Sequence, residues 1–320
     1  MPAEDDPLIN AISDAALDPL FWAPERQDSV RAWNGHIPFA HWLVGATRTG
    51  VLVELGTHAG VSYAAFCEAV LRTKTGTRCY AVDTWKGDEH AGFYDETVYL
   101  DFERFHDERF ASFSSLLRMT FDEATEHFVG GSVDLLHIDG LHSYHAVAHD
   151  FEKWLPKLSK RGIVVFHDTN ERRNGFGVWR LWAELRYQYP SFEFLHSHGL
   201  GILCVGSQSP APILTLCTHL DGEKVTIVRE RFESLGERWG VDQRERSQIA
   251  KASQAKQEAA EEKQETAQAE QDANQAAQEM AEAKQECAFA MLKVQEVNAA
   301  HQDILSSATW RLAAAIRGLQ

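Results

Sequence analysis

Residues 51–62 read Val-Leu-Val-Glu-Leu-Gly-Thr-His-Ala-Gly-Val-Ser, and this stretch decides the fold class. The apolar run 51–55 is typical of a buried strand. A helix is expected at 62–73. Gly56 and Gly60 let the backbone between strand and helix come close to a ligand, because no Cβ intervenes. A strand that leads through such a turn into a helix is where open α/β sheets bind their ligands.

Strand and helix patterns alternate through residues 49–207. Strands are expected at 78–82, 116–119, 133–138 and 162–166, and helices at 144–158 and 176–189. This alternation predicts a parallel sheet covered by helices on both faces. Two short strands, 192–196 and 200–205, close the domain, and the short turn between them requires an antiparallel hairpin. The expected fold is therefore an α/β, Rossmann-like doubly wound sheet with an antiparallel final strand.

The segments outside this domain differ from it in composition. Residues 1–48 hold short apolar clusters broken by prolines, and we expect them to form an N-terminal helical cap. Residues 208–242 are expected to be a bridging segment. From 241 to 317 there is neither Gly nor Pro, so nothing interrupts a helix. Seam positions spaced alternately by three and four residues over 243–305 predict a long C-terminal coiled coil.

The seam of this coiled coil consists mostly of alanine. Alanine buries little apolar area, so self-association is expected to be weak at the start and firmer near 294–304. The sequence thus predicts a homo-oligomer held by the coiled coil, and the alternative is a lone Ala-rich helix. Residues 306–320 begin Ser-Ser-Ala-Thr-Trp-Arg-Leu and resemble a short motif at the ends of bacterial glycan-assembly proteins. They also fit an amphipathic helix end that rests on a membrane surface.

Composition and charge exclude several kinds of partner. The formal net charge of −16 argues against nucleic acid, because neutralising phosphates requires a basic stripe that the sequence lacks. Five scattered cysteines without a CxxC pair indicate reduced thiols and no zinc site. The acidic first ten residues do not resemble a signal peptide, and no apolar stretch of ~18 residues is present. We therefore expect a cytoplasmic protein, membrane-associated at most through its C-terminal motif.

Asp83 ends the second expected strand, roughly 20 residues past the glycine loop. Its carboxylate can accept hydrogen bonds from ribose hydroxyls, and Glu54 can anchor the loop or a cationic amino-acid group. A nicotinamide dinucleotide needs Gly-x-Gly-x-x-Gly to cradle its pyrophosphate, but Gly56 and Gly60 lack a glycine at the two-residue spacing. S-adenosylmethionine has no phosphate, so the looser loop suits it. The alternative is an ordinary glycine turn.

Several short motifs share a family resemblance. They are Glu54-Leu55-Gly56 with Gly60 and Ser62, Val82-Asp83-Thr84-Trp85, His137-Ile138-Asp139-Gly140-Leu141-His142-Ser143-Tyr144, Val165-Phe166-His167-Asp168-Thr169, and His198-Gly199-Leu200-Gly201. The segment 49–206 resembles class I S-adenosylmethionine-dependent methyltransferases, in particular a bacterial subgroup related to macrolide-sugar and cephalosporin-pathway enzymes. The resemblance implies that this cofactor is bound by Glu54, Gly56, Gly60, Ser62, Asp83, Trp85, Met119 and Asp139. Trp85 and the 119–120 region would flank the adenine.

Asp139, His142 and Asp168 form a second constellation. The two acids follow adjacent strands, so both carboxylates are expected in one crevice, where oxygen ligands suit Mg²⁺. The site resembles that of metal-dependent catechol-type O-methyltransferases, which have Asn after the second acid. Here Thr169 follows Asp168, and Asn170 comes one place later. Asp168 can instead position a substrate hydroxyl, or both acids can simply cap loops.

His142, three residues past Asp139, is the expected general base. An imidazole with a pKa near 6.5 can take a proton from a hydroxyl at neutral pH. A metal would assist by lowering the pKa of that hydroxyl. His137, His145 and His167 are the alternatives, and His137 is expected to be structural because it lies within a strand.

These features predict in-line transfer of a methyl group from sulfonium to an acceptor oxygen. The expected acceptor is a sugar hydroxyl on a glycan or a glycosylated small molecule, with a glycan-assembly partner for the tail. One rival is a natural-product O- or N-methyltransferase. A second rival is a non-catalytic scaffold with a degenerate methyltransferase domain. The intact set of Glu54, Gly56, Gly60 and Asp83 argues against degeneracy.

Overall fold

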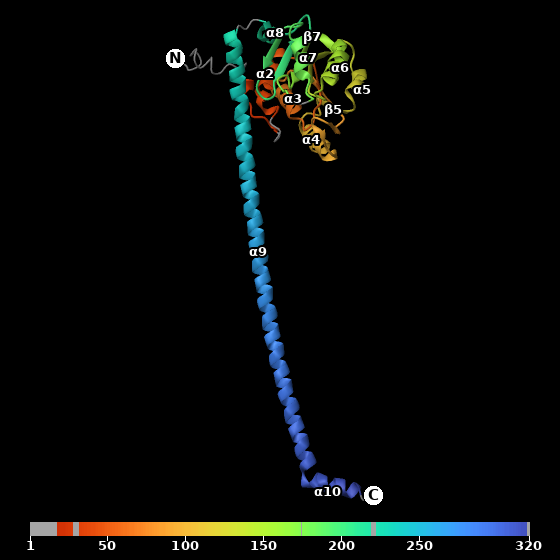
Figure 1. Ribbon diagram of the computed structural model, residues 1–320, viewed down its shortest axis with the longest axis vertical. Coiled ribbons are helices and arrows are strands. Elements are labelled where there is room, and N and C mark those ends of the chain that lie inside the picture. Colours follow the sequence, from red (N-terminus) through yellow and green to blue (C-terminus); the bar gives the residue numbers. More distant parts are fainter. Residues whose placement is uncertain (1–17, 28–31, 174, 219–221, 319–320) are drawn as a thin grey trace, which may run out of the picture. The chain divides into compact units, whose positions relative to one another are not determined.

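The computed structural model describes residues 18–27, 32–173, 175–218 and 222–318 (Figure 1). Residues 1–17 and 28–31 of the expected N-terminal cap lie outside these ranges. The chain divides into two compact units, Met1–Arg246 and Ser247–Gln320, and each is described by itself. The first unit is built on a seven-stranded sheet, and the second is helical.

The seven-stranded sheet has the order β5-β2-β1-β6-β7-β9-β8. The strands are β1 (Val51–Leu55), β2 (Arg78–Asp83), β5 (Ser114–Arg118), β6 (Val133–Ile138), β7 (Leu158–His167), β8 (Ser191–Phe194) and β9 (Leu200–Cys204). The first five strands in this order, β5, β2, β1, β6 and β7, pair in parallel. Strand β9 is antiparallel to both β7 and β8. The chain leaves β1 towards β2 and returns to the other side as β6. The predicted doubly wound sheet with an antiparallel final strand is confirmed.

Helices cover both faces of the sheet. They are α2 (Ile37–Thr47), α3 (Val61–Thr73), α4 (Glu96–Arg109), α5 (Phe121–Ala124), α6 (Tyr144–Trp154), α7 (Val178–Leu185) and α8 (Ala211–Thr218), with 3₁₀ turns η2 (Asp18–Phe21), η3 (Asn34–His36), η4 (Thr125–His127) and η5 (Leu155–Lys157). Successive strand residues point to opposite faces. Leu52 accordingly packs in the cluster with α2 and α3, and Val53 in the cluster with α6 and α7. Burial on both faces explains why apolar residues predominate in these strands.

A short hairpin differs from the sequence-based expectation. It pairs β3 (Gly87–Asp88) with β4 (Gly92–Phe93) in antiparallel fashion. Strands of two residues are too short to show an alternating apolar pattern, so nothing in the sequence signals them. Strand β7 also begins at Leu158, earlier than the expected 162, and the extra β7 residues are accommodated by a register irregularity in its pairing with β6 between Val133 and Leu135.

Helix α9 (Gly222–Ser306) is one continuous helix of 85 residues. Its first turns pack on the first unit, where Phe232 contacts Phe39 and Phe194 with ring centroids 5.5 and 5.2 Å apart. Most of the described part of the bridging segment 208–242 is therefore helical, in α8 and the start of α9, and one side of it packs on the sheet domain.

The second unit continues α9 and ends in α10 (Ala308–Arg317). Side chains of residues 251–306 are exposed, and bonds four residues apart, such as Gln254 to Glu258 at 2.9 Å, support the helix surface. The coiled-coil seam remains a prediction. Within the residues that the structure describes, no helix has both the length and the apolar character needed to cross a bilayer.

Candidate functional site

The carboxyl ends of four neighbouring strands bring the predicted site residues to one edge of the sheet. Leu55 of β1 pairs with Val82 of β2 and with Ile138 of β6. Ile138 in turn pairs with Phe166 of β7. The residues that follow these four are Gly56, Asp83, Asp139 and His167. They lie at the point where the strand order reverses, which is the usual ligand site of such sheets.

The loop after β1 has an unusual backbone. Gly56, His58 and Gly60 have positive φ angles of 89°, 49° and 78°. A Cβ on Gly56 would lie 2.1 Å from the carbonyl oxygen of Asp139, so only glycine permits this approach. His58 is strained in this region, and such strain persists only where the surroundings fix the residue.

The Asp83 side chain holds much of this loop in place. Its Oδ2 accepts hydrogen bonds from Thr57 N and His58 N at 2.9 Å each, and its Oδ1 accepts one from Trp85 N at 2.7 Å. A carboxylate has about four acceptor positions, so one is left for the ribose expected from the sequence. Trp85 is almost fully buried, and its Nε1 donates to His58 O at 2.9 Å. This bond supports the loop backbone, and a place for Trp85 beside the adenine stays a prediction.

Glu54 lies inside the core on the α3 side of the sheet. Its Oε2 is 2.8 Å from Nδ1 of His137, and both side chains are fully buried. Burial raises the pKa of Glu54, and the bonds from His137 and Ser62 partly oppose that rise. Trp33 covers the pair edge-on, with its ring 5.1 Å from that of His137. These contacts agree with a structural role for His137 and place Glu54 behind the cavity wall.

Two adjoining cavities open along the sheet edge. The first measures about 230 Å³ and is lined by, among others, Asp83, Thr84, Thr120, Phe121 and Gly140. The second measures about 250 Å³ and is lined by, among others, Trp33, Gly60, Ser62, Asp168 and Phe176. Both are also lined by Gly56, His58, Ala91, Asp139 and His142, so the two cavities meet. Met119 packs into the core beside Thr120.

Asp139, His142 and Asp168 converge where the two cavities meet. His142 Nε2 lies 2.8 Å from Asp168 Oδ2 and 3.4 Å from Asp139 Oδ1. Burial lowers the pKa of His142, but its hydrogen bonds to the two carboxylates and their charges outweigh burial and raise the pKa to about 9. His142 is therefore protonated at neutral pH in this arrangement. The sequence-based expectation of an ordinary imidazole pKa does not hold here.

His167 is a second imidazole in the cluster. Its Nδ1 lies 3.2 Å from Asp139 Oδ1, and its Nε2 lies 3.2 Å from the carbonyl oxygens of both Ala32 and Ser197. Burial opposes a charge on His167, yet the charges of Asp139 and Asp168 hold its pKa well above the ordinary value. With acceptors at both ring nitrogens, His167 is a charged partner of the carboxylates rather than a free base. His145 is exposed, and its ring meets that of Tyr144 edge to face.

The carboxylates are ionised in return. Burial alone would raise the pKa of Asp139 and Asp168, but the charge of His167 and hydrogen bonds from His142 hold both well below their usual range. His198 adds a contact of 3.2 Å between its Nδ1 and Asp168 Oδ1. The two negative charges are thus balanced by imidazolium groups within the cluster.

An aromatic stack closes one side of the cluster. Phe176 lies parallel to His142 with ring centroids 4.8 Å apart, and it also stacks with His90, again at 4.8 Å. His90 comes from the turn between β3 and β4, and Phe176 from the loop before α7. Reasoning from the sequence missed His90, Phe176, Arg173 and His198 as cavity residues. A strand pattern identifies only what directly follows a strand, and these four lie within loops.

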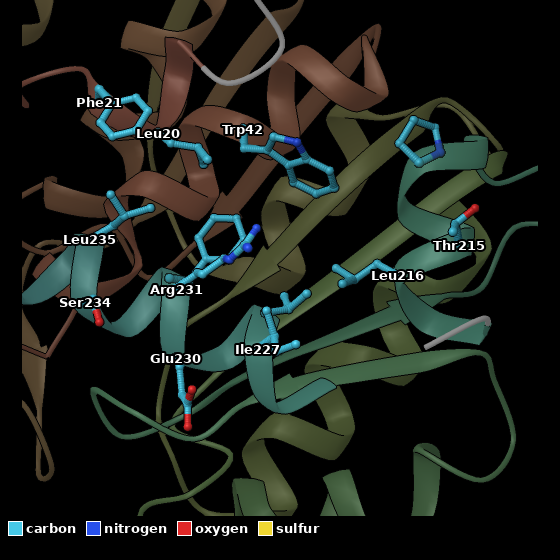
Figure 2. Close-up of a pocket in the computed structure, with 13 residues that line it drawn as sticks. Leu20, Phe21, Trp42, Thr215, Leu216, Ile227, Glu230, Arg231, Ser234 and Leu235 are labelled. Atoms are coloured by element: carbon cyan, nitrogen blue, oxygen red, sulfur yellow. The ribbon is translucent and has the colours of Figure 1, made fainter. Parts of the chain in front are cut away.

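A larger cavity, about 740 Å³, lies elsewhere in the first unit. Figure 2 shows it between η2, α2, α8 and the first turns of α9, with mostly apolar side chains around it. Trp42, Leu216 and Ile227 are among its lining residues, and none of the predicted site residues is. We place the functional site at the strand ends, because titratable groups with shifted pKa values converge there.

Residues 53–169 match the family model of a methyltransferase domain. The glycine loop, Asp83 and the cluster of Asp139, His142 and Asp168 all fall within this match. A curated relative, uncharacterized protein y4gI of Sinorhizobium fredii (strain NBRC 101917 / NGR234), is 47% identical over 234 residues, which cover 73% of this chain and 26% of the relative. The chain thus spans about a quarter of that relative's length.

Two solved structures are similar at lower identity. One is a putative caffeoyl-CoA O-methyltransferase from Staphylococcus aureus, with 14% identity over 55% of this chain and 91% of that chain, and a TM-score of 0.41. The other is the O-methyltransferase TomG from Streptomyces achromogenes, with 14% identity over 57% of this chain and 91% of that chain, and a TM-score of 0.40.

Proposed function

We propose that this chain is an S-adenosylmethionine-dependent O-methyltransferase that acts on a sugar hydroxyl of a glycan or a glycosylated metabolite. The observation that carries the proposal is the place where the two cavities meet. There the strained loop at Gly56 lies beside the ionised cluster of Asp139, His142 and Asp168. A group held by the loop would therefore lie next to groups that can hold a proton. The methyltransferase-domain match over the same residues supports this assignment.

The residues present fit the proposed cofactor. Asp83 keeps one acceptor position for a ribose hydroxyl, and Thr120 and Phe121 line the same cavity. The amides of Val61 and Ser62 belong to the first turn of α3, where backbone N–H groups have no acceptor within the helix. Such amides suit the carboxylate of the amino-acid part. S-adenosylmethionine supplies an activated methyl group on a sulfonium leaving group.

The donor set also fits a divalent cation. One ligand atom from each of Asp139, His142 and Asp168 lies within 4.8 Å of the others. The carboxylates of Asp139 and Asp168 suit Mg²⁺ or Mn²⁺, and His142 beside them is then left to act as the base. A divalent cation supplies Lewis-acid assistance by lowering the pKa of a bound hydroxyl.

The chain's own residues have three tasks in this proposal. Asp168 orients the His142 ring, and Phe176 holds its flat face. The two carboxylates are what raises the pKa of His142. A cation bound to them would lower that pKa again and so favour the neutral imidazole that a base requires. Trp33 and Phe176 on the cavity wall exclude water from the acceptor. Positioning and desolvation supply most of the remaining barrier reduction.

Two rival functions give different results in simple experiments. A natural-product O- or N-methyltransferase would bind the same cofactor and methylate an aglycone or an amine. A non-catalytic scaffold in glycan assembly would fail to bind S-adenosylhomocysteine, the product form of the cofactor. The aromatic wall of Trp33 and Phe176 beside several imidazoles suits a polar ring with many hydroxyls, which favours the sugar.

Methyl transfer to sugars tests the proposal. The protein is incubated with S-adenosylmethionine carrying an isotopically labelled methyl group and with surface glycans from the organism of origin, taken from a strain that lacks the gene. The label is expected in O-methyl sugars after hydrolysis and mass spectrometry. Label found only on aglycones or amines would contradict the sugar acceptor and support a natural-product methyltransferase. Absence of transfer to any fraction would favour the non-catalytic scaffold.

A further inference from the structure

Arg26 contacts the loop on which the proposed cofactor site depends. Only 15% of its side chain is exposed. Its Nε donates to the carbonyl oxygen of Ala59, and its Nη2 donates to Asp101 Oδ2 at 2.8 Å. Ala59 stands between His58 and Gly60, which both have positive φ angles. Arg26 therefore holds the loop at its most strained part.

Helix α4 supplies a platform for the Arg26 side chain. The guanidinium carbon lies 5.1 Å from the ring centre of Phe102 and 5.0 Å from that of Phe105. Phe102 is fully buried, and a Cβ on Gly60 would lie 2.1 Å from its ring. Arg26, Phe102 and Gly60 are thus packed together. A planar guanidinium can stack on a ring and donate to two acceptors at once, which a lysine ammonium cannot do equally well.

Arg26 completes the hydrogen bonding of the loop carbonyls. The carbonyls of Thr57, His58 and Gly60 accept from Gly60 N (2.7 Å), Trp85 Nε1 (2.9 Å) and Ala64 N (2.9 Å), respectively. These three donors lie within residues 53–169, the methyltransferase-domain match. The donor to Ala59 comes from outside that match, from a segment that precedes the first strand. Ala59 is half-buried, and a shielded carbonyl that loses such a donor destabilises the conformation it belongs to.

We propose that Arg26 is a positioning residue that keeps the 57–60 loop in the conformation required for the cofactor, an inference that rests on the proposed function. The other anchors act on different atoms. Asp83 binds the amides of Thr57 and His58, whereas Arg26 binds a carbonyl on the α4 side. Loss of Arg26 leaves the Asp83 bonds intact and frees the turn at Ala59.

Binding of S-adenosylhomocysteine is compared by titration calorimetry in the wild type, Arg26→Ala, Arg26→Lys and Asp101→Asn. Arg26→Ala is expected to bind about tenfold more weakly, which is about 1.4 kcal/mol. Arg26→Lys should fall between Arg26→Ala and the wild type. Asp101→Asn should bind as the wild type does, because the bond from Arg26 to Ala59 remains. Wild-type affinity in Arg26→Ala would overturn the proposal, and so would an equal loss in Asp101→Asn.

Hydrogen exchange of the ligand-free protein, read by mass spectrometry, gives a second readout that needs no cofactor. Arg26→Ala should speed exchange in peptides covering 57–62 and leave β6 and β7 unchanged. Arg109→Ala is the matched control, since its guanidinium carbon lies 4.4 Å from the Phe105 ring and its recorded bonds go to Glu25, Phe105 and Glu108. Two results would overturn the proposal: exchange that is faster throughout the domain, or exchange at 57–62 that is no faster than in the wild type. If the wild type binds no S-adenosylhomocysteine, the proposed function fails, and the exchange pattern alone still decides the role of Arg26.

Discussion

Asp83 accepts hydrogen bonds from three backbone amides, two of them in the glycine loop. Bonds to an ionised carboxylate are stronger than neutral ones, so this side chain organises the loop before a ligand arrives. The remaining acceptor position is the one available to a ribose hydroxyl. Under the proposed function, preorganisation of the loop and recognition of the cofactor would therefore depend on the same residue.

Asp83→Asn is expected to weaken binding of S-adenosylhomocysteine by about tenfold to a hundredfold. In asparagine, an NH₂ donor takes the place of one carboxylate oxygen and faces backbone N–H donors. Loss of a hydrogen bond to a charged group costs about 1.5–3 kcal/mol. Asp134→Asn is the matched control, because its carboxylate accepts from Gly50 N at 2.6 Å beside the start of β1. Titration calorimetry measures both variants. An equal loss of affinity in Asp134→Asn would show that such substitutions act by disturbing the fold and not through the ligand site.

Asp150 in α6 is expected to make stability depend on pH. Burial raises its pKa to about 7. Because this folded-state pKa lies above the unfolded value of about 3.9, its stabilising contribution is present below pH 4 and is lost as the pH rises through 7. Asp150→Asn should raise the free energy of unfolding by roughly 2–4 kcal/mol at pH 8 and by little at pH 4. Urea unfolding at both pH values measures this, and a gain independent of pH would contradict it.

Among the structural elements, the parallel strands were predictable because helices bury both of their faces. Residues 51–55 and 133–138 are therefore mostly apolar, with Glu54, Asp134 and His137 as the polar exceptions, and the acids that follow such strands could be placed in one crevice. The β3–β4 hairpin could not be predicted, because two residues carry no pattern. The positions of His90 and Phe176 depend on the path of their loops, which apolar spacing does not determine.

A metal requirement can be tested at the ends of β6 and β7, which Asp139 and Asp168 follow. If Asp139 and Asp168 hold a divalent cation in the working site, methyl transfer should fall in EDTA and recover with Mg²⁺ or Mn²⁺. Turnover of labelled methyl groups with and without chelator measures this. Full activity in EDTA would show that the two acids have another task, and His142 alone would then have to act as the base.

At the scale of the whole molecule, helix α9 belongs to both compact units. Its first turns are part of the domain packing. Trp239 is buried, and a Cβ on Gly236 would lie 2.1 Å from the carbonyl oxygen of Gly35. The boundary between domain and tail therefore lies after these residues, near Arg246, rather than at the start of the helix.

We propose that the tail mediates oligomerisation and that catalysis does not need it. Residues 247–306 extend roughly 90 Å at 1.5 Å per residue, and their apolar side chains, such as Val294 and Val297, are exposed. A chain truncated after Arg246 should be of lower oligomeric order and still methylate a soluble acceptor. Val297→Asp in the full chain should abolish association. Light scattering and a methyl-transfer assay measure both, and loss of activity in a folded truncated chain would contradict the division.

The central claim is that the loop at Gly56 and the carboxylate of Asp83 form an S-adenosylmethionine site. Titration calorimetry of S-adenosylhomocysteine into the full chain tests it most directly. We expect saturable binding of one molecule per chain. In Gly56→Ala, whose added Cβ would lie 2.1 Å from the Asp139 carbonyl oxygen, the binding should be lost. Absence of binding to the folded wild-type chain, or full binding by Gly56→Ala, would contradict the claim.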